Sequence, residues 1–297
     1  MIKANLNGSP LFFTEIWPLI HKKSIKFVRN LRVMLMHKKY HFGVALSGGG
    51  AKGFAHIGVM KALDEFGLVP DVIAGVSAGA VMAAFYSSGV TPDDTLKAFS
   101  QIRIGDLTSF SVPSNGLLKF DGFAKFLKKN LPVERIEQLH IPTIITATNL
   151  DTYKEDLFTS GPLVNCVLAS CSLPVVFKPT KVNGHTYIDG GVLHNLPAFA
   201  LRDKCDVLLG VNVSPLNTSP FKSSIADIAY RSYRLMTTHN SKPDLELCDV
   251  VINVDSMKKI STFDVKKMAD NAKEGYFAAM KVLVNSPILK QLRDERK

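Results

Sequence analysis

Apolar residues in this 297-residue chain fall into two alternating kinds of segment. Short continuous apolar runs are typical of buried strands, and longer amphipathic segments are typical of helices. The runs that predict strands are 41–47, 72–77, 142–149, 206–213 and 249–255. The segments that predict helices include 54–67, 78–89, 91–102, 121–130 and 262–284. This alternation predicts an α/β fold, a layered sandwich in which helices flank a central, mostly parallel β-sheet.

The chain divides into a short basic segment and one longer domain. Residues 41–297 contain no linker rich in proline, glycine or serine, so we expect a single domain there, with 214–224 as the best loop candidate. Residues 1–40 carry eight lysines and arginines against Glu15 alone, and therefore hold seven of the ten net positive charges. We expect 1–40 to be a basic, partly amphipathic N-terminal extension.

The extension has the pattern of a helix that lies at a membrane surface. Ile25, Val28, Leu31 and Leu35 fall near one helical face, and basic residues fall on another. Peripheral contact with the inner membrane surface is one interpretation. A helix docked on the domain, or a dispensable extension upstream of a second start at Met36, is the other. The apolar stretch before this helix is too short and interrupted for a membrane span, and it is not a signal peptide, so we expect a cytoplasmic protein.

Composition argues against several classes of protein. Beyond the extension the charge is nearly balanced, so nothing indicates a basic groove, and we expect no nucleic acid partner. The four cysteines include no CxxC pair and accompany no histidine cluster at metal-ligand spacing. We therefore expect neither a zinc site nor a disulfide scaffold, and we predict no metal or nucleotide cofactor.

A run of glycines follows the first predicted strand and precedes the first predicted helix. Gly48, Gly50 and Gly53 satisfy the spacing GxGxxG, with Asp71 downstream, so a dinucleotide-binding enzyme is one interpretation. The Walker phosphate-binding pattern fails, because Phe54 stands where a lysine is required. In every interpretation, free N–H groups at a helix amino terminus can bind a negatively charged oxygen.

A second motif suggests what that oxygen is. Gly75, Ser77 and Gly79 form GxSxG between a predicted strand and a predicted helix, the context of a nucleophile elbow. The alternative is an ordinary strand-to-helix turn with a serine N-cap. A serine hydroxyl needs a base to take its proton. The order Ser, Asp, His of ordinary α/β-hydrolases would end at His194 or His239, neither of which lies in a distinctive motif.

A carboxylate offers a different base. Asp189 ends a short apolar run and precedes Gly190 and Gly191, where a tight turn would present its side chain. Alone, Asp-Gly-Gly reads as a turn. The segment 169–179 has two prolines, and we expect it to shape one wall of a cleft while its serines only cap or turn it. His56, one turn into the helix after the glycines, is expected to be packed and hydrogen-bonded rather than catalytic.

Four blocks together resemble the patatin-like phospholipase family: GGGAKGFAHIGV, GVSAG, ASCSLPVVFKP and DGG, in that order and at compatible spacings. The resemblance runs from residue 41 to the carboxyl end, so 41–297 is identified as a patatin-like phospholipase domain. It implies catalysis by a Ser–Asp dyad without histidine. That dyad carries over to Ser77 as the nucleophile and Asp189 as the general base.

The resemblance also implies an oxyanion hole made by backbone N–H groups of the glycine block, here Gly48, Gly49 and Gly50. Lys52 stands at the family's basic position, before Gly53; the alternative for Lys52 is a solvated residue with no role. The implied activity is serine-dependent hydrolysis of lipid or phospholipid esters, of the phospholipase A or esterase type, with no cofactor. A non-catalytic lipid-binding member of the fold is the alternative.

Overall fold

The computed structural model describes residues 38–102, 109–110, 118–216, 220–221, 224–262 and 264–297. The amphipathic helix expected within the N-terminal extension lies outside these residues, so that helix and its membrane contact stay predictions. Tyr40–Lys297 folds as one unit. Among the described residues, no helix has the length and apolar character needed to cross a membrane.

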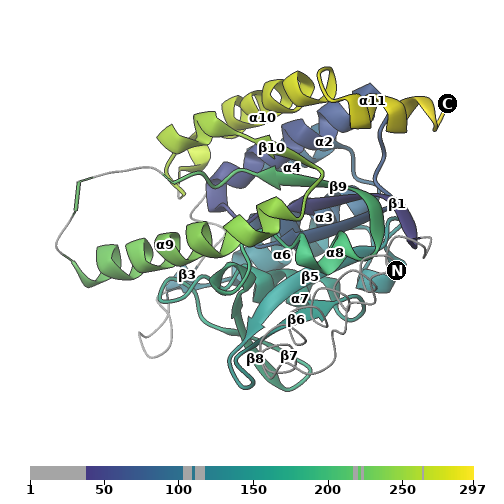
Figure 1. The fold of residues 1–297 in the computed structure, drawn as a ribbon. Helices are drawn as coiled ribbons and strands as arrows, with labels where there is room; N and C mark the ends of the chain where they lie inside the picture. Colours follow the sequence, from purple (N-terminus) through teal and green to yellow (C-terminus); the bar gives the residue numbers. More distant parts are fainter. Residues whose placement is uncertain (1–37, 103–108, 111–117, 217–219, 222–223, 263) are drawn as a thin grey trace, which may run out of the picture. The chain divides into compact units, whose positions relative to one another are not determined.

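A mixed β-sheet forms the middle layer of this unit (Figure 1). Its strand order is β10-β9-β1-β2-β5-β8-β7, and β6 also pairs with β5. Neighbours from β10 to β5 are parallel, whereas β6, β7 and β8 pair antiparallel. The strands are β1 (Tyr40–Leu46), β2 (Val72–Val76), β5 (Thr143–Asn149), β6 (Lys154–Phe158), β7 (Thr180–Val182), β8 (His185–Asp189), β9 (Cys205–Asn212) and β10 (Val250–Asn253); β3 (Ser109–Phe110) and β4 (Leu118–Lys119) form a separate ribbon.

The layered α/β prediction is confirmed, and the five predicted strands are all present. The antiparallel edge was not predicted, because its strands are short and half-exposed and therefore give no apolar run. The described helices are α2 (Phe54–Phe66), α3 (Ala78–Ser87), α4 (Pro92–Ser100), α6 (Asp121–Asn130), α7 (Leu163–Ser170), α8 (Phe199–Arg202), α9 (Ile225–Glu246), α10 (Met268–Leu283) and α11 (Pro287–Asp294). The long helix α9 is the main helical element that the sequence pattern missed.

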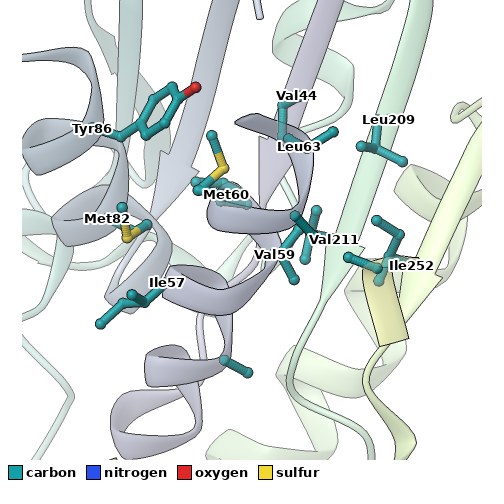
Figure 2. Packing of buried hydrophobic residues seen from close by; sticks show 14 of the residues in the cluster. Val44, Ile57, Val59, Met60, Leu63, Met82, Tyr86, Leu209, Val211 and Ile252 are labelled. Atoms are coloured by element: carbon teal, nitrogen blue, oxygen red, sulfur yellow. The ribbon is translucent and has the colours of Figure 1, made fainter. Parts of the chain in front are cut away.

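Alternation along the parallel strands sends side chains to two separate cores. Val44 and Leu46 of β1 face α2, α3 and α10, whereas Ala45 faces α8 and the end of α9. Leu209 of β9 faces the first core and Leu208 the second, as the period of two requires. Figure 2 shows the first core, where side chains of α2 and α3 meet those of three strands. The sheet is thus buried on both faces, which explains its continuous apolar strands.

Helices α2 and α10 pack side by side over the first face of the sheet (Figure 1). Their backbones approach closely because each helix has a glycine at the contact. A Cβ on Gly58 would lie 1.7 Å from the Ala272 carbonyl oxygen, and one on Gly275 would lie 1.9 Å from the Ala55 carbonyl oxygen. No side chain fits at either position unless the helices move apart.

We therefore expect Gly275→Ala to lower the free energy of unfolding by about 1–3 kcal/mol, the usual cost of overpacking a core. The measurement is urea denaturation followed by circular dichroism. Glu274→Ala, an exposed change on the same helix, is the matched control and is expected to change stability little. Equal stability of Gly275→Ala and the wild type would contradict the close approach of the two helices.

Candidate active site

Two strand ends meet on one edge of β5 and bring the candidate site together. Parallel β2 pairs with the first half of β5, where Val76 lies opposite Thr146. Antiparallel β8 pairs with the second half, where Asp189 lies opposite Ala147. Because β6 pairs along both halves, it occupies the other edge, and β2 and β8 share this one. The last residues of β2 and β8 therefore pair with two consecutive residues of β5, so the two strands end next to each other.

Ser77 follows β2 directly and sits on a strained turn. Its φ is 53°, in the region that non-glycine residues rarely adopt, and α3 begins at the next residue. The Ser77 N–H donates to Ser170 Oγ at 2.7 Å. Gly75 and Gly79 leave the room this turn needs, since a Cβ on Gly75 would lie 2.5 Å from the Gly79 carbonyl oxygen. The geometry is that of a nucleophile elbow and not of a serine N-cap, because the Ser77 side chain makes no capping hydrogen bond.

Asp189 ends β8 and is almost completely buried, with 1% of its surface exposed. Its carboxylate accepts a hydrogen bond from the Gly191 N–H at 2.8 Å, and the hydroxyls of Ser77 and Tyr233 lie beside it as further donors that lower its pKa. Burial raises the pKa of Asp189 to about 6, and these three donors oppose the rise. The structure therefore places Ser77 beside a carboxylate that is ionised at neutral pH. Gly190 fits between the strand ends, where a Cβ would lie 2.6 Å from the Thr146 carbonyl oxygen.

Helix α9 holds the loop that carries Asp189. The Tyr233 hydroxyl lies beside the Asp189 carboxylate. Asn240 Nδ2 donates to the carbonyl oxygens of Gly191 and Val192 at 2.9 and 3.0 Å. Tyr233 is buried, and the Asp189 charge helps burial to raise its pKa, so its hydroxyl stays protonated as a donor. Sequence reasoning missed both residues, because α9 carries no motif and no continuous apolar stripe.

The glycine loop offers fewer free donors than the sequence predicted. The Gly48 N–H already donates to the Asn195 carbonyl oxygen at 3.1 Å, so this amide is not available to an oxyanion. Within the described part of the chain, the amides of Gly49 and Gly50 have no acceptor, and both residues line the cavity. Ala78, the first residue of α3, lines it too, and first-turn amides lack an intrahelical acceptor.

Two residues of the glycine block are buried. Lys52 is 1% exposed, so the solvated interpretation of this side chain is wrong. Burial, and then the charge of Arg234, lower the pKa of Lys52 to about 8. His56 is fully buried, and its Nε2–H donates to the Ser47 carbonyl oxygen at 2.8 Å. Burial lowers the pKa of His56 to about 4, so this histidine is neutral and packed, as expected. Gly53 permits contact with α3, because its Cβ would lie 2.3 Å from that of Ala78.

The competing interpretations find no support in the geometry. No histidine is among the described residues that line the cavity: His194 Nδ1 contacts Asp244 Oδ2 at 2.8 Å, and His239 is exposed. Asp71, the candidate ribose ligand, lies before β2, at the opposite end of the strand from the glycine loop, and pairs with Arg296 at 2.6 Å. The described residues also contain no group of three or more His, Cys, Asp or Glu that could hold a metal ion.

A cavity of about 330 Å³ opens beside Ser77 and Asp189. Most of its lining is apolar and comes from α2, α3, α4, α6 and the segment 171–177. The end of α7 and the start of this segment also hold both strand ends, because Ser170 Oγ accepts from the Ser77 N–H and the Ser172 carbonyl accepts from the Asp189 N–H at 2.9 Å. Chemically, the arrangement offers an activated hydroxyl, a carboxylate base and free amides to a largely apolar ligand.

Comparison with known proteins adds an independent finding. A sequence model of the patatin-like phospholipase family matches residues 44–202. An uncharacterized NTE family protein of Mycobacterium tuberculosis is 33% identical over 184 residues, which are 61% of this chain and 51% of that protein. The lysophospholipase NTE1 of Candida glabrata is 27% identical over 67% of this chain and 12% of its own length. The chain thus spans about half the length of the mycobacterial relative and much less of the fungal one.

Among solved structures, VipD from Legionella pneumophila is similar over 83% of this chain and 67% of its own, at 16% identity and a TM-score of 0.46.

The contact between Tyr233 and Asp189 predicts a pH effect. Protonated Asp189 cannot take the Ser77 proton, so labelling of Ser77 by a fluorophosphonate is expected to fall as the pH falls through about 6. Tyr233→Phe removes a donor that lowers this pKa, so the acid limb is expected to move up by about one pH unit or more. Tyr276→Phe is the control, because it removes a hydroxyl that donates to the exposed Glu65 and not to Asp189. An unmoved limb in Tyr233→Phe would refute the role of this hydroxyl.

Proposed function

We propose, on the premise that this chain belongs to the patatin-like phospholipase family, that it is a serine-dependent lipid acyl hydrolase of the phospholipase A or esterase type. The observation that carries the proposal is that the Ser77 hydroxyl lies beside the buried Asp189 carboxylate, whose pKa it lowers, at the edge of an apolar cavity. An acyl chain needs apolar lining, and its ester carbonyl needs a nucleophile with a base in reach. The name of the fungal relative, a lysophospholipase, agrees with a lipid substrate.

In the first half of the proposed reaction, Ser77 Oγ attacks the ester carbonyl carbon while Asp189 takes the hydroxyl proton. The carbonyl oxygen becomes an oxyanion, which the amides of Gly49 and Gly50 stabilise because they border the cavity and have no acceptor in the described part of the chain. The bond to the alcohol then breaks, and the alcohol leaves with the proton that Asp189 returns. The product is an acyl ester on Ser77.

The second half reverses the roles. Asp189 takes a proton from water, the hydroxide attacks the acyl-enzyme carbonyl, and Ser77 leaves with the proton to regenerate the free enzyme. A pKa of about 6 suits this work, because the carboxyl is ionised at neutral pH and yet more basic than an exposed aspartate. The proposal needs no histidine and no metal or nucleotide cofactor.

Removing either member of the proposed dyad tests this mechanism. We expect Ser77→Ala and Asp189→Asn each to lower kcat for a short-chain nitrophenyl ester by about 10³-fold or more, because nucleophile and base act as a unit. Both side chains keep nearly the same volume, so circular dichroism is expected to remain unchanged. Fluorophosphonate labelling is expected in the wild type and not in Ser77→Ala.

His194→Ala and His239→Ala are the controls and are expected to keep most of the activity, because neither histidine lines the cavity. An active Asp189→Asn together with an inactive histidine variant would establish a conventional triad instead. A wild-type protein that binds lipid but is neither labelled nor active would be a non-catalytic lipid-binding member of the fold.

We further propose that the basic segment 1–40 holds this enzyme on an anionic membrane surface at the cytoplasmic side. The support is its sequence, since each basic residue near such a surface contributes about 1 kcal/mol at low salt. Deletion of residues 1–35 is expected to preserve hydrolysis of a soluble ester and to weaken co-sedimentation with anionic vesicles. Added salt is expected to weaken binding of the full chain, because surface charges are screened beyond about 10 Å. Equal, salt-insensitive binding of both proteins would exclude the membrane role.

A further inference from the structure

Arg234 is a buried cation in the wall of the active-site cavity. It follows Tyr233 on α9, is 6% exposed and lines the cavity together with Ser77 and Asp189. Its acceptors in the described part of the chain are all neutral: Nη1 donates to Ser214 Oγ, and Nη2 donates to the carbonyl oxygens of Ser214 and Pro215 at 3.3 and 3.0 Å. At least two of its five N–H groups, Nε–H among them, have no acceptor in the described part of the chain.

This lack of a carboxylate sets Arg234 apart from the other arginines that the structure describes. Each of those pairs with an acid: Arg135 with Glu137, Arg202 with Asp249, Arg231 with Asp227, Arg293 with Asp294 and Arg296 with Asp71. All five have side chains that are at least 20% exposed. Among the arginines that the structure describes, the one most removed from water is thus the one without a counter-charge, the reverse of what folding alone favours.

A second buried cation adds to this positive charge. Lys52 Nζ lies 3.5 Å from the Pro215 carbonyl oxygen, which also accepts from Arg234 Nη2. Among the described residues neither cation has a carboxylate at ion-pair distance, so two like charges share one neutral acceptor. An anion in the cavity would supply the missing counter-charge, and only Arg234 of the two lines the cavity.

We propose that Arg234 is a specificity-determining residue that binds a phosphate group on the alcohol part of the ester. The inference rests on the proposed function, because that function places the ester carbonyl at Ser77, in the cavity that Arg234 lines. The acyl chain of the proposed substrate contacts the apolar lining of the cavity, so the alcohol part of the ester lies on the side of Arg234. The planar guanidinium with unpaired N–H groups suits the oxygens of a phosphate.

The test compares two esters that differ only in the phosphate, 1-lauroylglycerol 3-phosphate and 1-lauroylglycerol. For Arg234→Gln we expect the ratio of kcat/KM for the phosphorylated ester to that for the neutral ester to fall at least tenfold. A loss of that size is expected when a hydrogen bond to a charged group is removed. The ratio does not depend on the fraction of folded enzyme, so a merely structural role of Arg234 would leave it unchanged. Arg231→Gln, on the same helix but paired with Asp227, is the matched control and is expected to keep the ratio.

If Arg234→Gln does not fold, Arg234→Lys replaces it, and a smaller fall of about threefold is expected because an ammonium lacks the planar fork. Inorganic phosphate is the second probe. It is expected to compete with the phosphorylated ester in the wild type and to compete more weakly in the Arg234 variant. Competition by inorganic phosphate with an unchanged ratio would mean a site for free phosphate and would overturn the proposal.

Two further outcomes separate this inference from the proposed function. If the wild type hydrolyses both esters and the ratio is the same in Arg234→Gln, this inference is wrong while the hydrolase stands. If the wild type hydrolyses neither ester, the proposed function fails, and calorimetry with 1-lauroylglycerol 3-phosphate still decides on Arg234. Binding by the wild type that weakens at least tenfold in Arg234→Gln would support the phosphate contact, and equal binding would overturn it.

Discussion

The register of β2 and β8 on a single edge of β5 is the constraint on which the site depends. Val76 and Asp189 pair with consecutive residues of β5, so the backbone ladder brings Ser77 and the Asp189 side chain together. A slip of one residue would turn every side chain of a strand to the opposite face and separate the two groups. Gly190 permits this junction, because a Cβ there would meet backbone of β5. The position of Ser77 relative to Asp189 is therefore fixed by the hydrogen bonding of the sheet.

The carboxyl group of Asp189 is buried where it lies beside Ser77, and other groups of the site favour its ionised form. Burial alone favours the protonated acid, which could not act as a base. Three donors from three elements oppose this effect: the hydroxyl of Ser77 after β2, the Gly191 amide after β8 and the hydroxyl of Tyr233 on α9. Asn240, also on α9, fixes the loop that carries the aspartate. The helix thus belongs to the site although it carries neither Ser77 nor Asp189.

Much of this could be predicted from the sequence, and the remainder depends on contacts that no local pattern encodes. Ser77 was identifiable because a strained turn needs small neighbours at fixed spacing, and the parallel strands because they are buried on both faces. Helix α9 was missed because it is largely polar and contains Pro243. The amide of Gly48 was assigned to the oxyanion hole, but the distant carbonyl of Asn195 occupies it. Lys52 Nζ likewise contacts the Pro215 carbonyl oxygen, which is far away in sequence.

The two ends of the parallel strands differ in how well their charges are matched. At the amino ends, Asp71 accepts from Arg296 and from the Phe42 amide, and His41 contacts both Asp206 and Glu295. At the carboxyl ends lie a serine with positive φ, a carboxyl of raised pKa and two cations that have no acid at ion-pair distance among the described residues. Such local violations are expected where a structure is shaped for something besides its own stability. In the described part of the chain, amides without an acceptor and a guanidinium with unpaired N–H groups border one cavity, so the proposed ligand, with an ester carbonyl and an anionic group, would satisfy both.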